Sequence, residues 1–430
     1  MIAVVGGGIT GLALGWELDR LGIDFVVLEG SDRPGGVIRS AEVGGHLLDW
    51  GPQRLRLTGD LAGMVQDLEL DDEVVTAPEG LDLFIYRDGR LRAVPFSLGG
   101  FVGADVLSLR GKFRALLEPF TDGPRPGERV ASYFSRKFGR EVYETIIGPL
   151  YGGLYSTDPA QMEVDLSLIH VLRQFRVGRS LLLRLLRRGG RITTPPACTF
   201  RSGMQTLPNA LARRLGARFR PSSRVRRIER VGSQWRVRLD DGTDFDARDV
   251  VVTTPARVAT ELLGSSVPTA AAAVSKLRYN RLAMVHLEAE TDLQGTGFKV
   301  SLQDRQLALG GVTFNHSLFG RENLYTAYVG GGWHAELMER DDEGLAELAV
   351  RDFRVTTGFD ARPISVERVE VPAWDTSWGT LRDFSLPDGL HVAANWKDRP
   401  GIPGRLAQAR RLAGALADRS LAAPSVSAHG

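Results

Sequence analysis

The chain has 430 residues, 43% hydrophobic and 25% charged, which is the composition of a soluble globular protein with two or three domains. Its formal net charge of +2 excludes the strong positive field of a nucleic-acid-binding protein. A single cysteine, Cys198, excludes an internal disulfide, and the seven histidines lack metal-binding spacing, so no metal site is expected.

The first thirty residues predict a βαβ unit that binds a dinucleotide. An apolar strand at 2–5 leads into G-x-G-x-x-G, a helical run at 12–21 and a second apolar strand at 25–28 that ends at an acid. The glycines permit a tight turn and close approach to a pyrophosphate, the helix N-terminus offers N–H groups, and the acid binds ribose hydroxyls. The residues assigned to the dinucleotide on this ground are Gly6, Gly7, Gly8, Ile9, Thr10, Gly11 and Glu29.

A second glycine pair follows the acid, in the sequence R-x-G-G-x-x-x-S over 33–40. Nicotinamide-binding domains do not require it. The loop is similar to one that runs beside the cofactor in a large class of flavoproteins, and this resemblance favours FAD over NAD. It implies that Gly30, Arg33, Gly35 and Gly36 contact the FAD.

Hairpin and helix patterns alternate over the next part of the chain. A Gly-Pro loop lies at 49–54, a helix is predicted at 61–70 and a hairpin at 83–95, and from about 98 to 190 the chain is mostly helical. Residues 179–191 form a basic, apolar helix. It either packs with a solvated arginine face or lies on an anionic membrane.

From residue 200 the α/β pattern returns. It includes a buried strand near 250–252, several alternating strands at 280–330 and a final helix at 406–421. The fold predicted is α/β: a Rossmann-like FAD-binding domain of the glutathione-reductase type, with an inserted helical domain and an α+β substrate-binding domain. The expected domains are FAD-binding at 1–75, 195–262 and 378–421, a mostly helical, membrane-facing insertion at 76–194, substrate-binding at 263–377, and a disordered tail at 422–430.

No secretory signal and no run of eighteen apolar residues are found, so a cytoplasmic location is expected, with peripheral membrane contact left open. A homodimer is equally compatible with the sequence.

Five motifs together resemble one family over nearly the whole chain. They are the glycine fingerprint at 6–11, the loop at 33–40, Gly-Pro at 51–52, P-L-Y-G-G-L-Y-S-T-D-P at 149–159 and F-R-S-G-M-Q-T-L at 200–207. The chain is similar to the FAD-dependent protoporphyrinogen and coproporphyrinogen oxidases of the flavin amine oxidase superfamily. Carried over by position, the resemblance adds to the cofactor-binding residues Gly51, Pro52, Gln53, Arg54, Val225, Trp374, Gly401, Ile402 and Pro403.

The chain departs from this family in two places. The late motif Gly401-Ile402-Pro403 lacks the acid that follows it in the family, and Leu83 stands where a family arginine pairs with a substrate propionate. Other cations are therefore the expected substrate ligands, namely Arg54, Arg56 and Arg92.

The resemblance implies a stepwise six-electron oxidation of a tetrapyrrole, a porphyrinogen, to protoporphyrin IX or coproporphyrin III in haem biosynthesis, with O2 as acceptor. Because the macrocycle gains aromaticity, no catalytic side chain is expected. A large apolar pocket with cationic groups at its rim is predicted.

Three alternatives stay open. A carotenoid- or squalene-type desaturase shares the superfamily, and so does an amine oxidase, which uses a lysine near the flavin. Lys276 and Lys299 are the only lysines of the middle insertion, and both are interpreted as surface charge. The third alternative is a flavin-binding scaffold without turnover.

Overall fold

The computed structural model describes residues 1–174, 180–187, 195–398 and 401–422. The ends of the predicted helix at 179–191 and nearly all of the tail at 422–430 lie outside these ranges.

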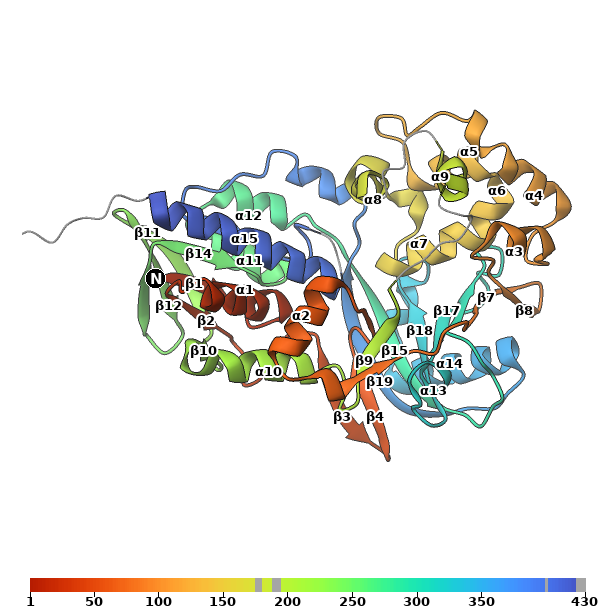
Figure 1. Cartoon of the computed structure of the whole chain (residues 1–430), viewed down its shortest axis with the longest axis horizontal. Coiled ribbons are helices and arrows are strands. Elements are labelled where there is room, and N and C mark those ends of the chain that lie inside the picture. Colours follow the sequence, from red (N-terminus) through yellow and green to blue (C-terminus); the bar gives the residue numbers. More distant parts are fainter. Residues whose placement is uncertain (175–179, 188–194, 399–400, 423–430) are drawn as a thin grey trace, which may run out of the picture.

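A five-stranded parallel sheet occupies one half of the molecule, at the left of Figure 1, with strand order β10-β2-β1-β14-β20. Every residue of β1 and β14 is buried, because these apolar runs are covered on both faces. The strands are β1 (Ile2–Val5), β2 (Phe25–Leu28), β10 (Phe219–Arg220), β14 (Asp249–Val252) and β20 (Leu390–Val392).

Alternate residues of β1 point to opposite sides of this sheet. Ile2 and Val4 pack in one core cluster with the helices α1, α10 and α15, whereas Ala3 and Val5 pack in another with a small antiparallel sheet. The helices are α1 (Ile9–Arg20), α2 (Gly59–Asp67), α10 (Thr206–Leu215), α11 (Ala256–Gly264), α12 (Pro268–Val274) and α15 (Ile402–Ala422). The small sheet contains β11 (Val225–Val231), β12 (Gln234–Leu239) and β13 (Asp244–Ala247).

A seven-stranded sheet forms the lower right of Figure 1, with strand order β19-β15-β18-β17-β16-β7-β8. Helix α14 (Asp342–Thr357) covers one of its faces through residues such as Leu345 and Phe353. The strands are β7 (Leu83–Arg87), β8 (Arg90–Ala93), β15 (Tyr279–Glu288), β16 (Gly297–Val300), β17 (Leu309–Phe314), β18 (Leu324–Gly330) and β19 (Arg362–Pro372), and α13 (Asn315–Phe319) lies between β17 and β18.

The third region is helical and lies at the upper right of Figure 1. Its helices are α3 (Leu98–Gly103), α4 (Leu109–Leu116), α5 (Val130–Phe138), α6 (Arg140–Val142), α7 (Gly148–Tyr155), α8 (Ile169–Gln174) and α9 (Leu181–Arg187). Two π-helical segments precede α7 and α8, at Tyr143–Ile147 and Val164–Leu168. The buried carboxylate of Glu118 links α5 to α9 within this helical region. It pairs with Lys137 of α5 at 2.8 Å and accepts hydrogen bonds from the first N–H groups of α9.

Shorter elements connect the three regions. They are the hairpin β3 (Arg39–Val43) and β4 (His46–Trp50), the small sheet of β5 (Leu55–Arg56), β6 (Val74–Thr76) and β9 (Ala197–Phe200), and the 3-10 turns at Asp71–Glu73, Glu118–Phe120, Pro159–Gln161, Gly216–Arg218, Ala335–Glu339 and Thr376–Leu381.

The predicted fold class is confirmed, and most predicted elements lie within a few residues of the observed ones. The division into domains stays a proposal. One segment lies outside the region that this division gives it. Hairpin β7–β8 is expected in the helical insertion at 76–194, but its strand β7 pairs in parallel with β16 of the seven-stranded sheet. Within the described ranges, no helix combines the length and the apolar character needed to cross a bilayer.

Candidate functional site

Close packing leaves no room for a side chain at two glycines of the turn after β1. Gly6 has φ +112°, and a Cβ there would lie 2.6 Å from the Oγ1 of Thr253. A Cβ on Gly11 would overlap the carbonyl oxygen of Gly6. The fold itself therefore requires two of the three fingerprint glycines, whatever the turn binds.

The remaining fingerprint glycine borders open space. No heavy atom lies within 4 Å of a Cβ built on Gly8, and α1 starts at the next residue, Ile9. The helix has no side-chain cap and no acid in its first turn, so its first N–H groups and the positive end of its dipole are not neutralised. This is the arrangement that a diphosphate needs, and the residues present therefore fit a dinucleotide.

Glu29 stands beside this turn, at the end of β2. One of its carboxylate oxygens accepts the N–H of Gly7 at 2.6 Å, and the other accepts the N–H and the hydroxyl of Ser31 at 2.8 and 2.7 Å. A carboxylate has lone pairs beyond these three bonds, so it can still accept from ribose hydroxyls.

The residues just before β11 contact the end of β2 at Glu29 and Gly30. The N–H of Ser223 donates to the carbonyl oxygen of Glu29 at 2.7 Å, and Arg224 packs against Gly30. Val225, assigned to the cofactor from the sequence, thus follows directly on the residues that contact this loop.

The second glycine pair closes over the first. The N–H of Gly35 donates to the carbonyl oxygen of Gly7 at 2.9 Å, and Gly36 has φ +60°. The guanidinium of Arg33 donates to the carbonyl oxygens of Gly36 and Ile38 at 2.8 and 3.0 Å. Arg33 therefore braces the loop that lies against the nucleotide turn.

The Gly-Pro loop is held in place by a close backbone contact and by the buried carboxyl of Asp49. Gly51 has φ +84°, and a Cβ there would overlap the carbonyl oxygen of Val37. The buried carboxyl of Asp49 accepts from the Ser40 hydroxyl at 2.5 Å and from the N–H of Met204 at 2.8 Å. Burial raises the pKa of Asp49.

The C-terminal residues assigned to the flavin are Trp374 and the turn at 401–403. Trp374 has φ +49° and stacks on Trp378, with ring centroids 5.3 Å apart. Gly401 has φ +89° and precedes the first turn of α15, which holds Ile402 and Pro403. Because α15 packs along α1, this turn is brought to the nucleotide side of the molecule.

The face of the seven-stranded sheet opposite α14 carries polar side chains. Lys299 of β16 is paired with Gly311 of β17, which is paired with Tyr328 of β18, so the three lie in one row across the sheet. Directly paired residues point to the same face. A neighbouring row on this face contains Thr313, Thr326 and His286.

Gln53, which follows Pro52, joins the Gly-Pro loop to this polar face. The Tyr328 hydroxyl donates to Oε1 of Gln53 at 3.0 Å, and Nε2 of Gln53 donates to Oγ1 of Thr326 at 2.7 Å. His286 lies beneath, with Nε2 3.2 Å from the carbonyl oxygen of Asp49. Burial lowers the pKa of His286 to about 4, so the ring is neutral at pH 7.

The three arginines expected to bind substrate lie in different settings. Arg56 donates to the carbonyl oxygen of Pro195 at 2.8 Å on the surface, and Arg92 pairs with Asp105 at 2.8 Å. Arg54 is exposed and follows Gln53, which bonds to Tyr328 of the sheet face, and desolvation by the surrounding protein lowers the pKa of the Arg54 guanidinium. Only Arg54 is thus placed beside the polar sheet face.

Lys299 was interpreted as surface charge, and this was wrong. Burial lowers the pKa of its amine to about 8, with a further contribution from the charge of Arg54. The side chain of Lys299 is half-buried, and its amine lies 5.2 Å from the centroid of the Tyr328 ring. Lys276, by contrast, is exposed. The sequence gives only a weak sign that Lys299 is functional, because it is a single lysine in a short strand of alternating polarity.

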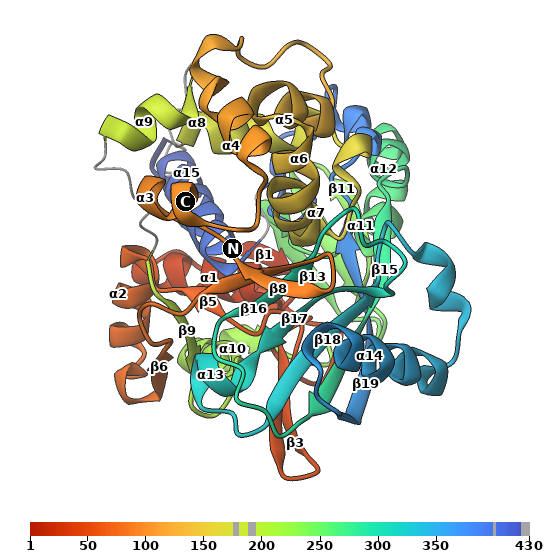
Figure 2. The ribbon, with the colours of Figure 1, turned by 90° about the vertical axis from the view of Figure 1, so that its right-hand side faces the viewer.

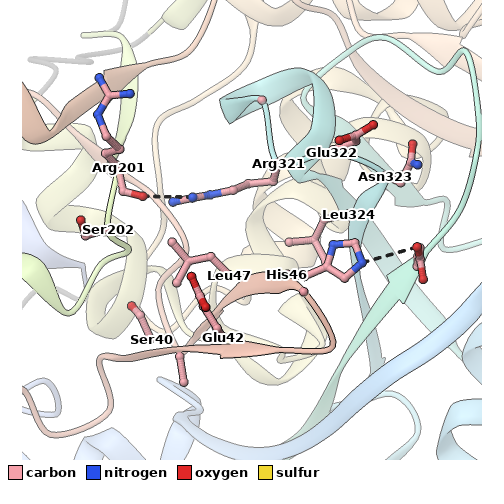
Figure 3. Close-up of a pocket in the computed structure, with 14 residues that line it drawn as sticks. Ser40, Glu42, His46, Leu47, Arg201, Ser202, Arg321, Glu322, Asn323 and Leu324 are labelled. Carbon is pink, nitrogen blue, oxygen red and sulfur yellow. Dashed lines mark hydrogen bonds and ion pairs between the residues drawn. The ribbon is translucent and has the colours of Figure 1, made fainter.

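The pocket drawn in Figure 3 is a different place. It has a volume of about 850 Å³ and lies between the β3–β4 hairpin, the loop after β9 and the start of β18. Its Arg321 donates to the Arg201 carbonyl oxygen at 3.0 Å, and its His46 lies 3.5 Å from Glu288. None of the residues assigned to the flavin lines it.

In the part of the chain that the structure describes, no three His, Cys, Asp or Glu side chains are grouped so as to hold a metal ion.

Comparison with known proteins gives three findings. Residues 9–385 match the profile of the family "flavin containing amine oxidoreductase". The chain is 29% identical to protoporphyrinogen oxidase 1, chloroplastic, of Spinacia oleracea over 82% of this chain and 70% of the relative, and 25% identical to coproporphyrinogen III oxidase of Bacillus subtilis (strain 168) over 87% and 86%. A crystal structure of a protein from Exiguobacterium sp. 255-15 superposes with a TM-score of 0.78 at 21% identity, covering 97% of this chain and 98% of the other.

Proposed function

Because the chain belongs to the flavin-containing amine oxidoreductase family, we propose that it oxidises a porphyrinogen to the porphyrin with O2 as the acceptor. The chain is a flavin-dependent oxidoreductase with FAD as its cofactor, as the fingerprint predicts. The observation that carries the proposal is that relatives named for protoporphyrinogen and coproporphyrinogen oxidation align with more than four fifths of the chain.

The chemistry proceeds in three two-electron steps, each of which removes a hydride from a bridging sp³ carbon together with a proton. Over the three steps, the four bridging carbons lose four hydrogens and the pyrrole nitrogens lose two. Three O2 molecules take up the electrons and protons, so one porphyrinogen gives one porphyrin and three H2O2. FAD, when bound, supplies the hydride acceptor. The residues proposed to hold it are the two glycine loops with Glu29 and Arg33, the Gly-Pro loop, and the turn at Trp374 and 401–403.

Amine oxidation is the second candidate, and the interior position of Lys299 favours it. The charge of the site argues against it. An amine substrate is a cation at neutral pH, and Arg54 beside Lys299 would repel it, whereas a tetrapyrrole brings carboxylates. We therefore rank porphyrinogen oxidation first.

The protein also presents an apolar surface that we propose rests on an anionic lipid bilayer. Leu109, Phe113 and Phe120 are 83%, 67% and 80% exposed on α4 and the turn after it. Arg110 lies exposed beside Leu109 on α4, and Arg187 is exposed at the far end of α9, whose first N–H groups are held against this turn by Glu118. Figure 2 shows α3, α4 and α9 together at the upper left. Exposed aromatic and aliphatic groups fringed by cations suit a negatively charged interface.

Sedimentation with vesicles tests the membrane proposal. Vesicles of phosphatidylcholine and phosphatidylglycerol should sediment together with the wild-type protein. The triple variant Leu109→Ser, Phe113→Ser, Phe120→Ser should stay in solution. Val355→Ser, on α14, is the control, because Val355 is also an exposed apolar side chain. Equal sedimentation of the triple variant and the control would overturn the proposal.

The enzymatic proposal is tested in air with both porphyrinogens. Purified protein should generate porphyrin fluorescence from protoporphyrinogen IX or coproporphyrinogen III, with three H2O2 formed per porphyrin. Release of H2O2 from amines, with no porphyrin from either macrocycle, would favour the amine oxidase instead.

A further inference from the structure

Two basic side chains, Lys299 and Arg54, flank the contact between Tyr328 and Gln53, because the Lys299 amine lies over the Tyr328 ring and Arg54 follows Gln53 in the chain. Lys299 comes from β16 and Arg54 from the loop after β4. Neither forms an ion pair or a hydrogen bond with another described residue, and among the charges that act on their pKa values there is no carboxylate. Two like charges in a desolvated place are unfavourable on their own. An anion bound between them would offset that cost.

The chain holds the Lys299 amine in place with two glycines. Gly311 lies directly beside Lys299 in the sheet, and a Cβ there would come within 2.8 Å of Cδ of the lysine. A Cβ on Gly153 of α7 would lie 3.3 Å from the Lys299 amine. This slot directs the amine over the ring of Tyr328, 5.2 Å from its centroid. The Tyr328 hydroxyl is already used, because it donates to Gln53.

The chemistry of the pair selects the ligand. A guanidinium binds a carboxylate through two parallel N–H donors, and an ammonium adds a third charged donor. A protonated amine would be repelled, and a neutral group would leave both cations unpaired.

We propose that Lys299 and Arg54 form a carboxylate-binding subsite, walled by the ring of Tyr328, that takes an acidic side chain of the substrate. The identification of that side chain as a propionate of a porphyrinogen rests on the proposed function. The subsite itself requires only that the ligand carries a carboxylate.

Affinity for a carboxylate should fall as pH rises. The amine has a lowered pKa of about 8, so above this pH the subsite keeps only the charge of Arg54. The other titratable group that faces the amine is the phenol of Tyr328, whose pKa burial raises. Binding should therefore weaken between about pH 7 and 9 in the wild type, and this weakening should be absent from Lys299→Met.

The first experiment titrates the holoenzyme with coproporphyrin III and with its tetramethyl ester, followed by porphyrin fluorescence. Lys299→Met keeps the side-chain length, and Lys276→Met removes an exposed lysine as the control. Lys299→Met should weaken binding of the acid by about tenfold and leave that of the ester within about twofold, because only the acid loses a charged hydrogen bond. Equal weakening of both, or of neither, would overturn the subsite.

A second probe separates the subsite from the proposed function. If neither porphyrin compound binds the wild type, 1-naphthoate against 1-naphthylmethylamine still decides the subsite, and the porphyrinogen assay decides the proposed function. The wild type should prefer the naphthoate, and Lys299→Met or Arg54→Gln should lose that preference. Preference for the amine would overturn the subsite.

Flavin content is measured for every variant. Lys299→Met should keep the flavin of the wild type, because the subsite serves the substrate. Loss of flavin from folded Lys299→Met would assign its amine to the cofactor and overturn the proposal. If Lys299→Met does not fold, Arg54→Gln, on a loop, provides the naphthoate comparison, made on protein of matched flavin content.

Discussion

The glycine turn after β1 and the polar face of the seven-stranded sheet are built in different ways. The turn consists of six consecutive residues packed closely against the ends of β2, β10 and β14, whereas the sheet face takes single residues from β16, β17, β18 and the loop after β4. Close packing around glycine Cα atoms fixes the turn, and side-chain contacts fix the face. Substitutions at the two tightly packed glycines of the turn, Gly6 and Gly11, should therefore disturb fold and cofactor together, and substitutions on the face should act one interaction at a time.

The largest effect is expected from Gly11→Ala. Its Cβ would overlap a backbone oxygen, which cannot move aside as a flexible side chain can. We expect the free energy of unfolding to fall by about 3 kcal/mol or more, with loss of flavin. Urea unfolding and the visible flavin absorbance measure both. Gly63→Ala in α2, where a Cβ meets nothing within 4 Å, is the control and should be neutral or slightly stabilising. A yellow Gly11→Ala protein as stable as this control would contradict the account.

The second prediction concerns acid and the sheet face. His286 is fully buried with a pKa of about 4, below its usual 6.5, so the unfolded chain binds a proton over this range and the folded protein does not. Its contribution to stability is present above pH 6.5 and is lost as pH falls toward 4, amounting to about 3 kcal/mol. Asp49 has a raised pKa in the folded protein, so its protonation increases the stability as the pH falls, which is opposite to the effect of His286.

Urea unfolding at pH 7 and pH 5 measures this loss. His286→Asn should be less stable at pH 7 and should lose less stability on going to pH 5 than the wild type. An identical pH dependence in the two proteins would show that His286 already accepts a proton in the folded state.

The third prediction separates packing from ligand binding within the turn. A Cβ on Gly8 meets no protein atom, so Gly8→Ala should leave the stability of the flavin-free protein unchanged. It should weaken flavin binding by about 1–3 kcal/mol, roughly five- to 150-fold, because the methyl group enters the space assigned to the diphosphate. Unchanged flavin affinity would move the cofactor away from this turn.

The smallest effect is expected from Tyr328→Phe. Removing the hydroxyl takes one hydrogen bond from Oε1 of Gln53 and should cost about 1 kcal/mol of stability. Flavin content should not change. A loss of stability comparable with that of Gly11→Ala would mean that the sheet face is as tightly coupled to the fold as the turn.

The sequence predicted the turn well because its pattern is local. Strand β2 has the predicted bounds, α1 begins three residues earlier than expected, and Glu29 lies beside Gly7. Each of these depends on neighbours within about thirty residues. The loop at 33–40 was also recognised, because its glycines are contiguous.

The sheet face could not be predicted in the same way. Lys299 reaches the interior because it pairs with Gly311 and Gly311 with Tyr328, and strand pairing of this kind is not contained in any single segment. Arg92 looked equally suited to bind substrate, but Asp105 lies next to it in the fold. Hairpin β7–β8 was likewise assigned by its position in the chain, whereas its partner strand, β16, comes two hundred residues later.

The most direct test of the proposed function is anaerobic mixing of the purified yellow protein with protoporphyrinogen IX and with coproporphyrinogen III. The account predicts that the visible flavin absorbance bleaches with at least one of them and returns when air is admitted. Flavin that stays oxidised with both porphyrinogens would contradict it.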